Sequence, residues 1–313
     1  MDRRSILFFF SATTAVAAFP LVLSGGTVTT LRVGMADPEW PSAPWHLLIQ
    51  WSESAARGLG YLIEHGHRLL GWTVGVLALV QTAMAWGVLR GCRRALVVLT
   101  LLGVGLQGLL GGLRVLYHAP YGLELAAVHG AMGHVVFALL CLVASMFAPT
   151  KDTESVVYSP RADKLNRLAG LVLLLCLLQL IPGVILRQFG QGPIGAVLVA
   201  HIFLALAIAF HVLLLYVRLQ NDDLLVHRAL KMPARALIVL VCVQWLIGPA
   251  AWAAGSGQGA SSGQVVHATM ALTATVHAGL AALVLAAAAV LYWRCREYLQ
   301  PIAVAEQEYQ KGV

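Results

Sequence analysis

The sequence predicts an all-α integral membrane protein with eight transmembrane helices, arranged as two pseudo-symmetric four-helix bundles. Three observations support this fold class: an apolar composition, eight long apolar runs, and an uneven distribution of basic residues. Of the 313 residues, 59% are hydrophobic and only 11% are charged, whereas soluble domains carry about 45–50% and about 25%. Such a chain has too few polar side chains to cover a surface in water, so lipid is the expected solvent.

Eight apolar runs approach or exceed the length of about 20 residues that an α-helix needs to cross a bilayer. The first run, 6–28, follows Arg3 and Arg4 and shares features with a signal peptide. It is longer than a signal-peptide core and no clear cleavage site follows it, so we predict a retained helix. The other predicted spans are 64–88, 94–116, 124–148, 167–187, 196–217, 234–253 and 265–292.

The basic residues predict the orientation of these helices. If the N-terminus is cytoplasmic, sixteen of the 21 Lys and Arg residues fall on the cytoplasmic side. Membrane proteins carry such an excess in their cytoplasmic loops, so we expect a multi-pass protein of the cell (inner) membrane with both termini cytoplasmic. The net charge of +7 therefore reflects topology rather than nucleic-acid binding. The five outer basic residues are Arg32, Arg57, Arg68, Arg114 and Arg187.

The cysteines show no pattern of metal ligands or disulfides. None lies in a segment predicted on the outer side of the membrane, and no CxxC motif occurs. We therefore expect neither a structural disulfide nor a thiolate metal site. The five residues are Cys92, Cys141, Cys176, Cys242 and Cys295.

Short motifs recur in the two halves of the chain. The segment 107–111 (QGLLG) resembles 244–248 (QWLIG), and 129–132 (HGAM) resembles 267–270 (HATM). A shift of four helices preserves orientation, so these motifs predict a parallel repeat. We place the boundary in the connection 149–166, which separates an N-terminal bundle from a C-terminal bundle, residues 1–150 and 151–313.

Four histidines stand at similar predicted depth on alternate helices, all of which run from outside to inside. Ionisable residues within a membrane are costly and usually functional. A facing pair in each bundle is the arrangement that axial ligation of haem iron requires. The alternative is a hydrogen bond across a helix interface, which explains one such histidine more easily than four. The candidate ligands are His67, His129, His201 and His267.

Other histidines fit this pattern less well. His211 and His277 each follow a candidate ligand by ten residues, which turns the side chain by about 80°. They mark either a second, inner site or polar contacts between helices, and we favour the contacts. His134 points about 140° away from His129, so it is not expected to bind the same metal. His65 lies about 200° from His67 and is interpreted as an interface or loop residue.

Charged residues accompany the outer ends of the helices. Glu64 lies three residues before His67, on the same helix face. It orients a ligand, relays protons or stabilises a cationic intermediate, or it is simply an acid favoured by the helix dipole. The arginines Arg68, Arg114 and Arg187 either pair with haem propionates or extend to the membrane surface, and the sequence does not decide between these.

These residues together resemble the haem A synthase family. Residues 64–68 (EHGHR) are similar to its Glu-x-x-His-Arg motif. Segments 25–30 (GGTVTT) and 37–41 (DPEWP) resemble the end of its first helix and its first outer loop, and 107–115 (QGLLGGLRV) resembles its third helix. The resemblance covers nearly the whole chain, and the histidines at 129, 201 and 267 match its remaining ligand positions.

The resemblance implies an oxidoreductase that converts the ring methyl of haem O to a formyl group through hydroxylated intermediates. His67 and His129 would bracket haem O, with Glu64 as the essential acid. His201 and His267 would hold a haem b cofactor that passes electrons. The family also implies partnership with haem O synthase and with cytochrome oxidase assembly; the electron donor is not specified by the sequence.

Two departures from the family pattern keep other functions open. Some bacterial members carry a cysteine pair in the first outer loop, whereas 29–63 contains none. His134, His211 and His277 are additional to the pattern. The alternatives are a di-haem b-type cytochrome that relays electrons to or from quinone, and a haem transporter or chaperone, which would not need Glu64.

Overall fold

The protein is an all-α membrane protein with eight helices long and apolar enough to cross a bilayer. The computed structural model describes residues 2–43, 45–148, 156–189, 194–256, 268–302 and 304. The eight predicted spans are confirmed, and most helices extend beyond the apolar runs because their polar ends continue past the hydrocarbon region. They are α1 (Arg3–Thr30), α4 (Leu59–Trp86), α5 (Gly91–Leu116), α6 (His118–Phe147), α7 (Ala162–Phe189), α8 (Ile194–Asn221), α9 (Arg228–Ser256) and α10 (Ala268–Tyr298).

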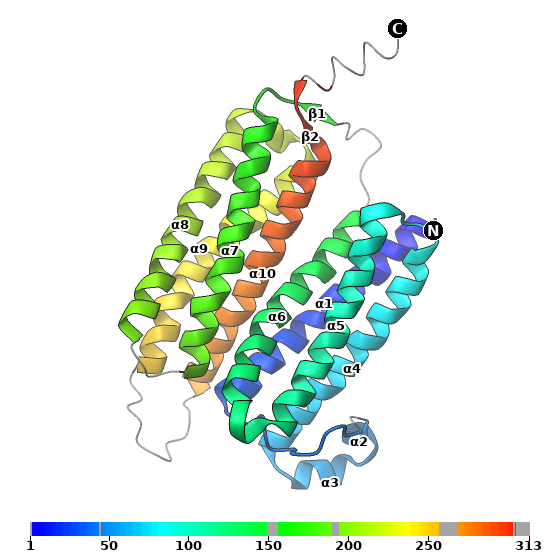
Figure 1. Cartoon of the computed structure of the whole chain (residues 1–313), viewed down its shortest axis with the longest axis vertical. Coiled ribbons are helices and arrows are strands. Elements are labelled where there is room, and N and C mark those ends of the chain that lie inside the picture. Colours follow the sequence, from blue (N-terminus) through cyan, green and yellow to red (C-terminus); the bar gives the residue numbers. More distant parts are fainter. Residues whose placement is uncertain are drawn as a thin grey trace.

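The eight helices form two neighbouring groups of four (Figure 1). In the first group α1 packs on α4 and α6, and α5 packs on both α4 and α6. In the second, α7 packs on α8 and α10, and α9 packs on α8 and α10. The groups meet where α10 contacts α1 and α6, and where α6 contacts α7. One buried apolar core runs through both groups, with Leu140, Leu165, Leu215 and Leu285 among its members.

Large apolar side chains cover the outer faces of the helices. Phe203 and Phe210 on α8 are 67% and 62% exposed, and Leu246 on α9 is 76% exposed. Water would disfavour so large an apolar surface, whereas lipid tails are as apolar as these side chains. The exposure pattern is therefore that of helices whose outer faces contact a bilayer.

The segment between α1 and α4 folds over one end of the first group (Figure 1). It contains two short helices, α2 (His46–Ile49) and α3 (Trp51–Ala56). Gly58 has a φ of 93°, a conformation that glycine adopts without steric cost. This turn lets the chain enter α4 directly after α3.

At the end of the molecule opposite α2 and α3, short elements connect the long helices (Figure 1). Strand β1 (Val157–Tyr158) pairs in parallel with β2 (Leu299–Gln300), and a 3-10 helix, η1 (Leu224–Val226), precedes α9. These contacts connect the start of α7 with the end of α10.

Candidate functional site

Two pairs of histidines face each other inside the two helix groups. The ring centroids of His67 on α4 and His129 on α6 lie 6.3 Å apart. Those of His201 on α8 and His277 on α10 lie 6.4 Å apart. Three of these four residues were predicted as ligands, and the fourth was assigned to helix contacts. We refer to His67, His129, His201 and His277 as the site histidines.

The site histidines lie at comparable depth. Each follows the start of its helix by seven to eleven residues, counted from Leu59, His118, Ile194 and Ala268. At 1.5 Å per residue these distances are about 10–17 Å along the helix axes. The two pairs thus occupy one layer of the molecule, near the end that carries α2 and α3.

His277 takes the structural position that the sequence assigned to His267. His267 lies outside the described residues. In the described helices Gln107 donates its side-chain amide to the carbonyl oxygen of His129, at 3.2 Å. Gln244 donates in the same way to the carbonyl oxygen of His277, at 3.1 Å. His277 is therefore the counterpart of His129, and its ring also lies 3.3 Å from the amide nitrogen of Gln244, a polar contact between helices of the kind expected.

The sequence spacing explains why His267 was favoured. Gln107 precedes His129 by 22 residues, and Gln179 precedes His201 by 22 residues, with a bond of 3.0 Å to its carbonyl oxygen. His267 follows Gln244 by 23 residues, close to this spacing, but the residue that Gln244 contacts follows it by 33. The Gln-x-x-x-Gly motif recurs on three predicted spans, at Gln107, Gln179 and Gln244, and only at the third does the contacted histidine depart from the spacing of 22 residues.

A glycine contacts the ring of each site histidine. A Cβ atom added to Gly111, Gly183 or Gly248 would lie 3.5, 3.5 or 3.3 Å from the Cε1 atom of the facing histidine, which is His129, His201 or His277 respectively. For Gly25 and His67 the distance would be 2.8 Å. A larger residue at Gly25 would displace the ring. Because the four glycines have no side chain, each imidazole packs directly against the backbone of a neighbouring helix. This contact fixes the position of the ring.

The imidazole nitrogens differ in their partners. His67 bonds through Nδ1 to the hydroxyl of Ser24, at 2.9 Å. The Nδ1 atoms of His129, His201 and His277 are buried and have no hydrogen-bond partner among the described residues. A buried polar atom without a partner is costly. In these three rings the unpaired nitrogen lies on the side of the supporting glycine, Gly111, Gly183 or Gly248.

The geometry fits a haem iron held by two imidazoles. A metal about 2.0 Å from each of two imidazole nitrogens places the ring centroids about 6 Å apart, as observed for both pairs. Within the described ranges, no group of three or more His, Cys, Asp or Glu side chains that suits a metal ion occurs. Two side-chain ligands are few for a bare ion, but they are the number that a haem iron takes on its axis.

Glu64 belongs to a buried ion network rather than to the histidine pair. It is 3% exposed, and its Oε1 atom accepts from Arg68 at 3.0 Å. Its Oε2 atom accepts from the backbone N–H of Asp37 at 2.9 Å. The carboxylate of Asp37 contacts both Arg68, at 2.8 Å, and His65 Nδ1, at 3.0 Å. Both Glu64 oxygens are therefore engaged, and His65 is confirmed as an interface residue.

An open cavity of about 420 Å³ lies between α1 and α4 and reaches His67. Its lining is mostly apolar, so a hydrophobic molecule can occupy it. Ser24, the hydrogen-bond partner of His67, also faces it. The lining residues are Ser24, Thr27, Leu62, Ile63, Gly66, His67, Leu69 and Leu70.

The three outer arginines are all anchored. Arg68 belongs to the Glu64 network, and Arg114 donates to the carbonyl oxygen of Gly34 at 3.3 Å. Arg187 donates to Gly26 and Ala274 carbonyl oxygens at 2.7 and 2.9 Å. None of them extends freely to the membrane surface. The site histidines stand within a few residues of each contact.

The two remaining membrane histidines make helix contacts. His134 bonds through Nε2 to the carbonyl oxygen of Ala278 at 3.1 Å, which joins α6 to α10. His211 bonds to the carbonyl oxygen of Ala207 on its own helix, at 2.7 Å. Neither belongs to the two facing pairs. The five cysteines are free, as expected.

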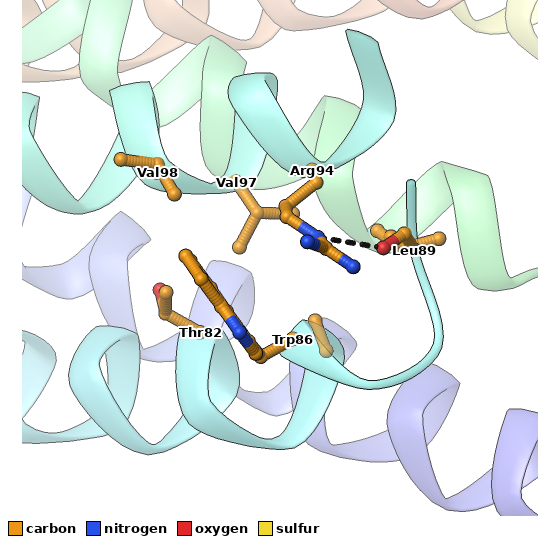
Figure 2. Close-up of a pocket in the computed structure, with 7 residues that line it drawn as sticks. Thr82, Trp86, Leu89, Arg94, Val97 and Val98 are labelled. Carbon is orange, nitrogen blue, oxygen red and sulfur yellow. Dashed lines mark hydrogen bonds between the residues drawn. The ribbon is translucent and has the colours of Figure 1, made fainter. Parts of the chain in front are cut away.

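A second depression, at the α4–α5 turn, is unrelated to the histidines. Figure 2 shows Trp86 beneath the guanidinium of Arg94, which lies 5.0 Å from the ring centroid. The Nε atom of Arg94 donates to the carbonyl oxygen of Leu89 at 2.8 Å. The residues around this depression lie at the far end of α4 from His67, about 30 Å along the helix, and their contacts hold the turn.

The chain matches no protein-family model, and a search of curated proteins finds no relative of it.

Proposed function

We propose that the protein binds haem between each pair of site histidines and acts as a haem A synthase, oxidising the ring methyl of haem O to a formyl group. The observation that carries this proposal is the His67–His129 pair, with centroids 6.3 Å apart, beside an open apolar cavity and near a buried network around Glu64. We also propose the inner membrane as its location, with both termini cytoplasmic, because sixteen of 21 basic residues then lie inside.

The cavity beside His67 supports our proposal that the substrate binds in the first helix group. A substrate must enter and leave, whereas a resident cofactor need not. The cavity of about 420 Å³ is open and bordered by leucine and isoleucine side chains. Haem O is hydrophobic and partitions into the bilayer, so lateral entry between α1 and α4 is the natural route. Ser24 then holds the His67 ring in place through Nδ1, which leaves Nε2 for the iron.

Glu64 supplies a fixed negative charge near this pair. Its two oxygens accept hydrogen bonds from Arg68 and from the backbone of Asp37. A carboxylate held in this way is better suited to stabilising positive charge at a reacting carbon than to carrying a proton away. The same bonds attach the outer segment around Asp37 to α4, next to the cavity.

The second pair is proposed to hold the haem b cofactor, with His201 and His277 as ligands in place of His201 and His267. Bound haem would supply one-electron chemistry there. The rings rest on Gly183 and Gly248. This placement leaves the two haems in neighbouring helix groups at the same depth.

A second candidate is the di-haem b-type cytochrome, which relays electrons without oxidising haem. The similarity of the two pairs favours it, because their centroid separations are 6.3 and 6.4 Å. Both candidates predict two bound haems. They differ in whether the first haem is chemically changed.

The test is to express the chain in a host that makes haem O but not haem A, and to chromatograph the extracted haems. Haem A, or its hydroxymethyl precursor, supports the synthase. The Glu64→Gln variant should retain haem but lose this product, whereas Glu53→Gln, on the exposed outer helix α3, should behave like the parent. Haem-loaded protein that yields only haem O and haem B, with a reductant supplied, supports the cytochrome.

A further inference from the structure

Arg187, in the last turn of α7, joins three helices from both groups. Its Nη2 atom donates to the carbonyl oxygen of Gly26 at 2.7 Å and to the hydroxyl of Thr30 at 2.8 Å, both on α1. Its Nη1 atom donates to the carbonyl oxygen of Ala274 on α10, at 2.9 Å. One guanidinium thus connects the helix group of His67 with that of His201 and His277.

Arg187 and the residues that it contacts lie close in sequence to a site histidine or to the glycine that supports its ring. Gly26 follows Gly25, whose backbone supports the ring of His67. Ala274 precedes His277 by three residues on α10, and three residues is less than one helical turn. Arg187 itself follows Gly183, which supports His201, by four residues. The guanidinium therefore contacts the neighbour of Gly25 on α1 and, on α10, a residue less than one turn from His277.

The close approach of the helices depends on Gly26. A Cβ atom there would lie 3.3 Å from Cγ2 of Thr275 and 3.6 Å from Nη2 of Arg187. Thr30 also lies 3.4 Å from Thr275, hydroxyl to hydroxyl. These contacts form a polar junction of α1, α7 and α10 inside an otherwise apolar interface.

The corresponding arginine of the first group does not make this junction. Arg114 follows Gly111 by three residues, much as Arg187 follows Gly183 by four. It contacts Gly34 in the outer segment instead, and no contact joins it to α7–α10 among the described residues. Arg114 is thus a matched arginine close to one pair, whereas Arg187 is shared by both.

The charge of Arg187 is not neutralised by any described carboxylate. Its bonded acceptors are two carbonyl oxygens and one hydroxyl, and no ion pair joins it to an acidic side chain in the described part of the chain. A guanidinium has five N–H groups, and three are used in these bonds. A cation in a medium of low dielectric acts strongly on nearby charges.

We propose that Arg187 is the cation shared by the two haem sites, and that its charge raises the reduction potential of the haem held by each pair. Reduction adds one electron to the haem, so a fixed positive charge nearby favours the reduced form. A cation close to both pairs stabilises an added electron on either haem, so it keeps both potentials high. This inference rests on the proposed binding of haem by the site histidines, but it does not require that haem O be oxidised.

The experiment is an optical redox titration of the full chain loaded with haem b at both sites. His67→Ala and His201→Ala backgrounds, each retaining one haem, assign the two midpoint potentials. Arg187→Gln should lower both potentials, and Arg187→Lys, which keeps the charge, should leave both close to those of the parent. Arg114→Gln should lower only the potential of the His67–His129 haem.

Several results would overturn the inference. Haem-loaded Arg187→Gln with unchanged potentials would remove the charge effect. Equal shifts in Arg187→Lys and Arg187→Gln would assign the effect to hydrogen bonding instead. Thr30→Val removes one acceptor and keeps the charge, so its two potentials should match those of the parent; lowered potentials in this variant would contradict the proposal even if Arg187→Gln failed to fold. A parent chain that binds no haem would overturn both this inference and the proposed function.

Discussion

Gln244 on α9 donates its side-chain amide to the carbonyl oxygen of His277 on α10, at 3.1 Å, and its amide nitrogen also lies 3.3 Å from the Nε2 atom of the ring. The same carbonyl bond joins Gln107 to His129. His277 is therefore the candidate partner of His201. Variants of His277 and of His267 distinguish the two candidate ligands.

Replacing His277 should remove the haem of the second pair. His277→Ala is expected to abolish the bis-histidine absorption of that haem, because His201 would be its single remaining side-chain ligand. Absorption spectra of the purified variants measure this. His211→Ala, which loses only a bond to its own helix, is the matched control. If His267→Ala lost the haem and His277→Ala kept it, the assignment would be wrong.

Gly25 should not tolerate a side chain. In Gly25→Ala the new Cβ atom would lie 2.8 Å from Cε1 of His67, and overpacking of this kind costs about 1–3 kcal/mol. We expect lower haem occupancy of the first pair with an intact second haem, measured by haem content per chain. Gly75→Ala on α4, where no atom lies within 4 Å of the added Cβ, should leave occupancy unchanged; equal losses in both variants would contradict the role of Gly25.

The hydroxyl of Ser24 should strengthen haem binding by His67. Ser24→Ala removes the 2.9 Å bond to Nδ1, and losing such a supporting bond costs about 10–100-fold in affinity. Titration of the apoprotein with haem measures the loss at the first pair. Ser11→Ala on the same helix removes a buried hydroxyl that has no described partner, so it should have no effect. Unaltered affinity in Ser24→Ala would show that the bond does not orient the ligand.

Glu64 should matter for stability as well as for chemistry. Glu64→Gln leaves Arg68 without one of its two carboxylate partners, and breaking a buried ion pair costs about 3–5 kcal/mol. We expect a lower melting temperature in detergent together with loss of haem oxidation. Thermal unfolding measured by circular dichroism tests the first effect, with Glu53→Gln as the exposed control. A melting temperature equal to that of the parent would mean that the network adds no stability.

The composition and periodic apolar runs were sufficient to predict all eight spans. Segments such as 196–217 and 167–187 are so apolar that only a helix in lipid satisfies both their side chains and their backbone. Three of the four site histidines were also predicted, because His67, His129 and His201 stand at similar distances from the starts of alternate helices. For these residues the sequence number and the rise per residue fix the depth in the membrane.

Only the tertiary structure decided which side chains meet. His277 faces His201, a meeting that the sequence spacing did not predict, whereas His267 lies outside the described residues. The partners of Glu64 and Arg187 were likewise beyond sequence reasoning. Glu64 bonds to residues 37 and 68, and Arg187 to α1 and α10. Such contacts depend on side-chain direction at helix crossings, whereas apolar periodicity determines only which helices form and where they lie in the membrane.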